Sequence, residues 1–505
     1  MNWLKKYQAQ FLDPQADIGN VDIPPPVTAN HHGGHRTSTT AAGAYESGFT
    51  PLPPETGGQW DYLPAFPRQF NALHVVAGAN GKILLIAGSG KNKANFTAGT
   101  FTSYIWDPVS DQRRQIPTPV DMFCSGHALL PDGRALVGGG TASYAPFKGI
   151  PALYAFNFTT EQYEELSPLE VGRWYPTAVT DSDGRVLFVA GFDENGIKTN
   201  ITESFDYRTD TLTRVPSMKS LPNYPHLHLA ANDQLFVANT LQPGFWDPYA
   251  DTYTRVTGFM GPSLTSATMA SCFVGDVRDQ NLMVLGGGWP ATNITRIIDL
   301  DEPTPTYRQG PTLGAAKAYV SCVNLPDGTL FEANGGSSNT IAGASSEAAI
   351  LTSVDAEWTP VNPLPEGEHR VYHSLLFLLD SGQVISTTSN PKNQARNGSV
   401  LVYSPPYLFQ GERPVITSAP AAVTYGGSYQ VSATATDATV DRMTLTAAPS
   451  PTHSLDSNQR YVSLPVINGA ITMPTSGAIL PPGWYRLWAV DSLDRPSIAT
   501  WIHLS

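Results

Sequence analysis

Asp183-Gly-Arg-Val-Leu-Phe-Val-Ala-Gly191 is the stretch that decides the fold, because its pattern of turn, apolar run and Gly- or Asn-rich end recurs along the chain. Asp132-Gly-Arg-Ala-Leu-Val-Gly-Gly139 and Asp327-Gly-Thr-Leu-Phe-Glu-Ala-Asn-Gly335 are two further copies. In all, seven such runs end at residues 88, 139, 191, 239, 287, 335 and 388, so neighbouring copies lie 48 to 53 residues apart. Self-similarity at a fixed period of this size indicates a repeat architecture.

Each copy predicts a small antiparallel sheet. Asp-Gly and Asn-Gly pairs favour type I′ hairpin turns, which need positive φ at both central residues. A strand-like run precedes the turn, as in Ser125–Leu130, and a second pair of runs follows, as in Ser103–Pro108 and Phe245–Pro248. Four strands in about 50 residues are typical of a kelch-type blade. The sequence therefore predicts an all-β chain with a seven-bladed kelch-type β-propeller over residues 60–410.

Two segments lie outside the repeats. Residues 1–59 contain many Pro and Gly residues and predict an irregular N-terminal arm, in which His31, His32 and His35 form either a copper-capturing cluster or part of a mobile polar loop. Residues 411–505 alternate apolar and polar side chains over short runs, which predicts a small Ig-like β-sandwich.

Composition excludes several classes of function. The net charge of −13 argues against binding to nucleic acid or to an anionic membrane surface. No apolar run reaches the roughly 18 residues that a membrane span needs. The three cysteines do not form a disulfide framework, and Cys272 and Cys322 in similar strand-like runs are interpreted as small buried packing residues.

The repeat register predicts a cluster of reactive side chains. Counting eight residues back from the turn aspartates gives Cys124, Tyr175, Tyr319 and Tyr372, and Tyr372 is followed by His373. We expect Pro225-His226 of the fourth copy at the same level. Because the innermost strands of a propeller line its channel, equivalent positions should face one another at one mouth.

The chemistry of such a cluster is limited. One thiol without a carboxylate-backed histidine is weak support for acyl transfer, and a zinc site would use more Cys or His residues. Phenolates with imidazoles form a mixed N,O set that suits copper(II). A copper ion and a phenoxyl radical together can accept the two electrons that alcohol oxidation releases.

Four segments carry a family resemblance: Asp121-Met-Phe-Cys-Ser-Gly126, Gly172-Arg-Trp-Tyr-Pro-Thr177, Arg370-Val-Tyr-His-Ser374 and Pro451-Thr-His-Ser-Leu455. Their order and spacing resemble the galactose oxidase and glyoxal oxidase family of copper-radical oxidases. The resemblance covers nearly the whole chain beyond residue 55 and implies a propeller followed by a sandwich that supplies one metal ligand.

The resemblance also implies a role for each matching residue. The sulfur of Cys124 would be bonded to the ring of Tyr175, and this thioether-modified Tyr175 would bind one copper ion and hold the radical. Tyr372 would be the axial ligand that takes the hydroxyl proton of the substrate. His373 and His453 would complete the ligand set. The substrate would be a small-molecule or carbohydrate alcohol or aldehyde, and O₂ would be reduced to hydrogen peroxide.

Departures from galactose oxidase narrow this expectation. Trp174 precedes Tyr175 where galactose oxidase has Gly, which is similar to the glyoxal oxidase branch and favours small aldehydes or simple primary alcohols over galactose. Trp174 and Trp289 are the candidates for the aromatic side chain that shields the radical. We expect the remaining polar residues, His127, His226, His228, Tyr319, Arg173 and Arg370, to line the channel, join the blades or orient the substrate.

Two rival functions remain open from the sequence. One is a propeller that binds glycans or proteins without redox turnover, and the other is a metal-dependent hydrolase, which would require clustered carboxylates. The segment Met1-Asn-Trp-Leu-Lys-Lys lacks the apolar core of a signal peptide, which fits a cytosolic protein or one whose leader was removed. The resemblance favours an extracellular or cell-envelope location.

Overall fold

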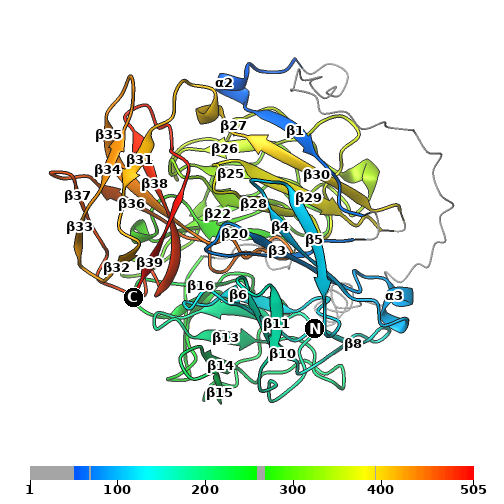
Figure 1. The fold of residues 1–505 in the computed structure, drawn as a ribbon. Helices are drawn as coiled ribbons and strands as arrows, with labels where there is room; N and C mark the ends of the chain where they lie inside the picture. The colour runs from blue at the N-terminus through cyan, green and yellow to red at the C-terminus, as the bar shows by residue number, and fades with distance from the viewer. Residues whose placement is uncertain (1–49, 68–69, 259–267, 393) are drawn as a thin grey trace.

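The computed structural model describes residues 50–67, 70–258, 268–392 and 394–505. Seven four-stranded antiparallel sheets form the larger part of this described chain (Figure 1). In six of them the strands follow one another outward in chain order, as β2–β3–β4–β5 does in the first. The predicted N-terminal arm falls mainly on residues 1–49, and with its three histidines it lies outside the described residues.

The strands of the first four sheets are short, as expected for blade-like units. Their bounds, sheet by sheet, are β2 (His74–Ala77), β3 (Ile83–Gly88), β4 (Thr102–Asp107) and β5 (Gln112–Pro117); β6 (Gly126–Leu129), β7 (Ala135–Gly138), β10 (Leu153–Asn157) and β11 (Gln162–Glu165); β12 (Thr177–Thr180), β13 (Val186–Val189), β14 (Glu203–Asp206) and β15 (Thr211–Arg214); β16 (Leu227–Leu229), β17 (Leu235–Val237), β18 (Gly244–Asp247) and β19 (Thr252–Arg255).

The last three sheets continue this pattern. Their bounds are β20 (Ala270–Phe273), β21 (Asn281–Leu285), β22 (Thr295–Asp299) and β23 (Arg308–Gln309); β24 (Ser321–Asn324), β25 (Leu330–Ala333), β26 (Ala349–Leu351) and β27 (Thr359–Pro360); β28 (Leu375–Leu378), β29 (Val384–Ser389), β30 (Asn397–Ser404) and β1 (Gln59–Leu63). Short elements between strands are α2 (Pro54–Gly57), α3 (Lys93–Thr97), β8 (Thr141–Ser143), β9 (Lys148–Gly149), η3 (Val277–Asp279), η4 (Ile341–Gly343) and η5 (Pro406–Leu408).

The all-β prediction is confirmed, and the packing explains why an inner strand such as β3 is apolar on both faces. Alternate side chains of a strand point to opposite faces of its sheet. In β3, Leu84 packs into a core shared with the second sheet, and Leu85 packs into a core shared with the seventh. Every consecutive pair of sheets shares such a cluster, and the seventh and first sheets share one as well. No helix of the described residues is long and apolar enough to cross a lipid bilayer.

The prediction of type I′ hairpin turns is wrong. In the second sheet, the N–H of Leu130 donates to the C=O of Arg134 (2.8 Å), and the N–H of Gly133 donates to the C=O of Leu130 (2.9 Å). Gly133 has φ of 89°, while Pro131 fixes a negative φ at the first central position. These are three-residue loops, in which a type I turn is followed by a left-handed residue. The same two bonds recur in the hairpins that begin at Gly78, Asp181, Ala230, Leu325 and Leu379.

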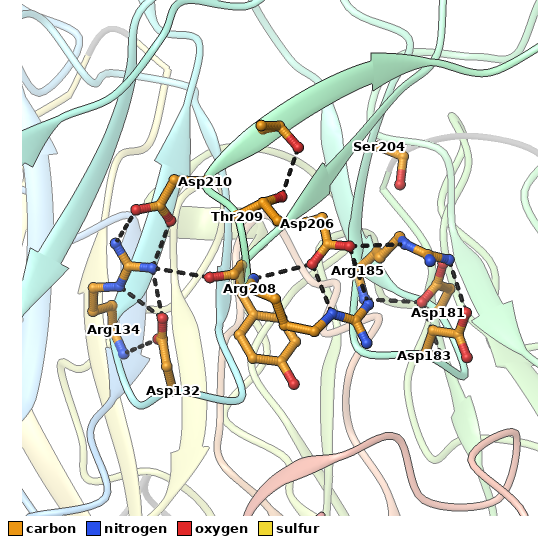
Figure 2. Close-up of polar contacts among 12 residues, drawn as sticks. Asp132, Arg134, Asp181, Asp183, Arg185, Ser204, Asp206, Arg208, Thr209 and Asp210 are labelled. Atoms are coloured by element: carbon orange, nitrogen blue, oxygen red, sulfur yellow. Dashed lines mark hydrogen bonds and ion pairs between the residues drawn. The ribbon is translucent and has the colours of Figure 1, made fainter.

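Arginines after these turns connect neighbouring sheets. Figure 2 shows Arg134, which follows the second-sheet hairpin, between Asp132 (2.6 Å) and Asp210 of the third sheet (2.7 Å). Arg185, at the equivalent place in the next repeat, pairs with Asp183 (2.8 Å) and lies close to Asp206. These ion pairs are partly exposed, so each contributes at most about 1 kcal/mol. They orient the hairpins, and the shared apolar cores supply most of the stability.

The first strand of the chain completes the last sheet. β1 pairs antiparallel with β30, with Trp60 opposite Tyr403. The Trp60 indole is 3% exposed, and its Nε1–H donates to the backbone C=O of Asn362 (2.9 Å). Its ring lies 4.9 Å from that of Tyr403, which stacks in turn on Phe331 of the sixth sheet. β1 is therefore anchored in the core between the sixth and seventh sheets.

The C-terminal strands form a separate group, which lies to one side of the sheets in orange to red (Figure 1). A five-stranded sheet has the order β32-β39-β38-β35-β36, and two-stranded sheets pair β31 with β34 and β33 with β37. The bounds are β31 (Val415–Ser418), β32 (Ala422–Val423), β33 (Ser428–Gln430), β34 (Ser432–Thr434), β35 (Val440–Ala447), β36 (Tyr461–Pro465), β37 (Ala470–Thr472), β38 (Gly483–Asp491) and β39 (Thr500–Leu504).

We predict that Trp60→Ala lowers the free energy of unfolding by about 3–5 kcal/mol, the usual cost of truncating a buried Trp. Denaturant unfolding followed by circular dichroism measures the loss. Val109→Ala is the control, because this side chain is 98% exposed and its truncation should change stability by less than about 0.5 kcal/mol. Equal effects of the two substitutions would contradict an anchoring role for β1.

Candidate metal centre

Several predicted site residues share one unusual backbone conformation. Cys124, Tyr175, Tyr319 and His373 each lie two residues before an innermost strand, and their φ angles are 62°, 68°, 62° and 64°. Left-handed φ costs free energy for residues other than Gly, and such strain is concentrated at functional sites. The positions are also bonded to one another, since the N–H of Tyr175 donates to the C=O of Cys124 (2.9 Å). The repeat therefore holds equivalent residues at one level.

The register differs from the sequence prediction in two sheets. His373, rather than Tyr372, is the equivalent of Tyr175, because the last hairpin has Ser381 where the other turns have their Asp, and Asp380 stands one position earlier in the loop. In the fourth sheet, the left-handed residue is Tyr224, and not the expected His226. Counting eight residues back from Asn232 would have found Tyr224. Its N–H donates to the C=O of Tyr175 (3.0 Å), which continues the series.

His453 reaches the sheets from the C-terminal strands. It lies between β35 and β36, in a segment whose backbone pairs with the edge of β2. The N–H groups of Val75 and Ala77 donate to the C=O groups of Pro451 (3.3 Å) and Pro449 (3.1 Å). Further along the segment, the Gln459 side chain accepts from the N–H of Asn324 in β24 (2.7 Å). Residues 448–460 are therefore fixed at both ends against innermost strands, with His453 between them.

Five side chains converge where these elements meet. The phenol oxygens of Tyr175 and Tyr372 are hydrogen bonded to each other. The rings of His373 and His453 lie 4.7 Å apart at 89°, and that of Tyr175 is 5.1 Å from that of His453. The Cys124 sulfur and one ring nitrogen of each histidine lie within 4.8 Å of one another. The histidines and the cysteine are buried, whereas the two tyrosines are partly exposed, so small molecules can approach from the phenol side.

Hydrogen bonds on the far side of each imidazole leave Nε2 directed at the cluster. The Thr452 hydroxyl donates to the C=O of Leu73 (3.0 Å), so it accepts the hydrogen of His453 Nδ1 (2.7 Å). The Asn71 amide lies 3.3 Å from His373 Nδ1. Among the described residues, Nε2 of His373 has no hydrogen-bond partner. A buried nitrogen without a partner is costly, and a metal ion would satisfy it.

Burial sets the charge state of the cluster in the metal-free protein. Desolvation, together with the nearby His127 and Lys91, lowers the pKa of His453 to about 3, so the imidazole is neutral at pH 7. Desolvation also raises the pKa of Tyr175 well above its usual value, and the neighbouring Cys124 and Tyr372 add to this rise. The Tyr175 phenol therefore stays protonated unless a positive ion compensates the charge.

A stack of aromatic rings covers Tyr175. Trp174 lies 3.7 Å from the Tyr175 ring at 8°, and Phe147 stacks on the other face of Trp174 at 4.4 Å and 9°. Trp289 instead contacts Tyr319, at 5.7 Å. Of the two candidates for a shielding aromatic, Trp174 is therefore the one in contact with Tyr175. Sequence reasoning missed Phe147, which lies in a loop segment with no motif to mark it.

The other sequence candidates have structural partners. His127 bonds to Ser450 (2.8 Å) and His74 (3.1 Å). His226 and His228 share the Ser271 hydroxyl, at 2.8 and 2.7 Å. Arg173 and Arg370 are fully buried. Arg173 forms an ion pair with Glu203, and Arg370 forms one with Glu368, so both have a structural role. Tyr319 packs on the Tyr372 ring at 5.2 Å.

The donor set fits a copper ion. Two phenol oxygens and two imidazole nitrogens form the mixed N,O set that suits copper(II). In the described chain, the group of Cys, His, Asp and Glu side chains close enough to share an ion is Cys124, His373 and His453, and it contains no carboxylate. A hydrolase site with clustered carboxylates, the second rival from the sequence, therefore has no support here. The fold and cluster define an all-β protein in which two groups of strands together build a centre of buried imidazoles and partly exposed phenols.

Comparison with known proteins agrees with this class. Residues 413–504 match the family described as galactose oxidase-like, early set domain. The chain is 29% identical to the aldehyde oxidase GLOX of Vitis pseudoreticulata, over 80% of the chain and 85% of that protein. It is 26% identical to a WSC domain-containing protein of Arthroderma benhamiae, over 88% of the chain but only 52% of that protein's length.

A solved structure extends the similarity to the fold. The structure of a fungal alcohol oxidase of the AA5 family, in complex with copper, superposes with a TM-score of 0.77, covering 89% of the chain and all of that structure at 20% identity. The resemblance that the four motifs predicted is therefore confirmed: residues 413–504 match a galactose oxidase-like domain, and the chain is similar to proteins named aldehyde oxidase GLOX and galactose oxidase.

We predict that Thr452→Val weakens the binding of Cu²⁺ to the metal-free protein by about 10- to 100-fold, the usual cost of removing a group that orients a ligating histidine. The substitution removes the hydroxyl that holds His453 Nδ1. Titration against a copper-binding competitor measures the dissociation constant. Thr352→Val, on an exposed side chain after β26, should leave it unchanged.

Proposed function

We propose that this protein is a copper-radical oxidase that converts small primary alcohols, or aldehydes in their hydrated form, with O₂ to the aldehyde or acid and hydrogen peroxide. The observation that carries the proposal is the convergence of two phenols and two imidazole nitrogens beside a buried thiol. The relatives named for aldehyde oxidase and galactose oxidase activity support the reaction class. Bound copper, together with an oxidised tyrosine, would supply a two-electron acceptor.

Each side chain has a distinct part in this proposal. Tyr175, Tyr372, His373 and His453 would hold the ion. Tyr372, which is partly exposed, would accept the hydroxyl proton of the substrate, and the Tyr175 ring would accept a hydrogen atom from the substrate carbon. Two electrons and two protons then pass to O₂, which leaves as hydrogen peroxide.

A covalent bond between Cys124 and Tyr175 completes the proposed cofactor. The Cys124 thiol is fully buried, with its sulfur 3.9 Å from His453 Nε2, and the neighbouring Tyr175 phenol also interacts with it. Desolvation raises the pKa of this thiol, so it is not a thiolate nucleophile at pH 7. Its placement beside the ring instead supports a thioether, formed with the loss of one hydrogen from the thiol and one from the ring.

The seven sheets and the C-terminal strands surround the proposed site. We infer that the seven sheets close into a ring over residues 60–410, because the seventh and first sheets share an apolar core. Residues 411–505 would then form the domain whose one task at the site is to supply His453. An extracellular or cell-envelope location suits a protein that releases peroxide.

Peptide mapping by mass spectrometry tests the cofactor. Protein expressed without copper should acquire a Cys124–Tyr175 link, lighter by two hydrogens, after aerobic addition of copper. Cys124→Ser should lack the link and turn over at least about 100-fold more slowly, which equals about 2.7 kcal/mol in the activation barrier. Cys272→Ser is the matched control and should retain both the link and the activity. Separate peptides in copper-loaded protein would overturn the radical mechanism and favour a propeller that only binds its ligand.

A second experiment tests the shielding of the radical. An aromatic stack contributes about 0.5–1.5 kcal/mol, so we expect Trp174→Leu to shorten the lifetime of the oxidised site by about 2- to 10-fold. The decay of the radical absorbance measures this lifetime. Trp289→Leu is the control, since Trp289 contacts Tyr319 rather than Tyr175. An equal loss in both variants would show that stacking on Tyr175 is not the cause.

A further inference from the structure

Two cysteines outside the metal centre lie side by side. Cys272 is in β20 of the fifth sheet, and Cys322 is in β24 of the sixth. Their sulfur atoms are 2.9 Å apart, although 50 residues separate them along the chain. Cys272 is buried and Cys322 nearly so. The sequence interpretation of two independent packing residues therefore misses a pair that bridges the innermost strands of adjacent sheets.

The distance between the sulfurs is informative. It is shorter than two thiols need for an ordinary contact, and longer than the roughly 2.03–2.05 Å of a disulfide bond. A small rotation of the side chains would close the gap, because each sulfur already points at the other across the sheet boundary. The third cysteine, Cys124, contacts His453 and Tyr175 instead, so it does not compete for either partner.

We propose that Cys272 and Cys322 form a disulfide that joins the fifth and sixth sheets when the protein folds in the presence of a small disulfide oxidant. One thiolate attacks the oxidant, forms a mixed disulfide and releases one small thiol. The second cysteine then attacks the mixed disulfide and releases the other small thiol. Two electrons pass from the cysteines to the oxidant, and the chain loses two hydrogens.

This disulfide would link β20 to β24, and β24 is the strand on which the segment that carries His453 rests. The Gln459 amide accepts from the N–H of Asn324 (2.7 Å) and lies 3.5 Å from the C=O of Cys322, so the segment rests on the strand that carries one of the cysteines. A cavity of about 20 Å³ between Cys322, Asp456 and Gln459 leaves room for local movement at this contact. The disulfide would hold the two sheets together beneath it. The inference does not depend on copper or on turnover.

Full-length copper-free protein, folded with oxidised glutathione and then alkylated under denaturing conditions, provides the test. We expect a peptide pair joining Cys272 to Cys322 that separates on reduction with dithiothreitol. A Cys124–Tyr175 thioether would not separate, so the two cross-links are distinguishable. Alkylation of both Cys272 and Cys322 without prior reduction, or a link from either one to Cys124, would overturn the proposal.

Thermal unfolding provides a second readout. Closing a loop of 50 residues stabilises the fold by restricting the unfolded chain. For a chain of this size, we expect reduction to lower the melting temperature of the wild type by about 4 °C. The Cys272→Ser, Cys322→Ser double variant should melt at the same temperature with and without reductant. Equal sensitivity of the wild type and the double variant to reductant would contradict a disulfide between these residues.

Discussion

The proposed metal centre depends on the backbone pairing between β2 and residues 449–452. This pairing brings a segment of the C-terminal strands against the innermost strand of the first sheet. The contact then positions the other groups, since Thr452 bonds to Leu73 and orients His453 through the same hydroxyl. Without it, three of the four proposed ligands would remain, but the fourth would have no fixed place. The second group of strands is thus part of the site.

A repeated backbone conformation supplies the remaining geometry. The left-handed residue before each innermost strand is Cys, Tyr or His in the sheets that build the site. Backbone bonds from Tyr175 to Cys124 and from Tyr224 to Tyr175 fix their spacing from sheet to sheet. The same left-handed conformation in successive repeats therefore directs different side chains, a thiol, phenols and an imidazole, toward the same site. The strain of these positions is offset by the apolar cores that flank every sheet.

Much of this organisation could be predicted from the sequence, because the period and the hairpin residues specify one kind of unit. The cluster followed from the register, including Cys124 and Tyr175. In the last hairpin the Asp stands one position earlier in the loop, at Asp380, so counting back from it gave Tyr372, whereas His373 is the equivalent residue. Contacts between distant segments could not be predicted: Asn71 beside His373, Phe147 on Trp174, and Cys272 against Cys322 arise from packing that leaves no local pattern. The type I′ turns failed because these hairpins form three-residue loops, in which the Asp or Asn lies in a type I turn and only the residue after it has a positive φ.

The pairing of β1 with β30 has a consequence for the order in which the protein is made. Gly57, just before β1, accepts a hydrogen bond from Tyr403, 346 residues later in the chain. At typical translation rates of about 5–20 residues per second, the first strand waits on the order of 20–70 s for its partner. During this interval the other three strands of the seventh sheet have not been made, and the apolar Trp60 has no core to enter. A chaperone that holds the nascent chain would have its greatest effect in this interval.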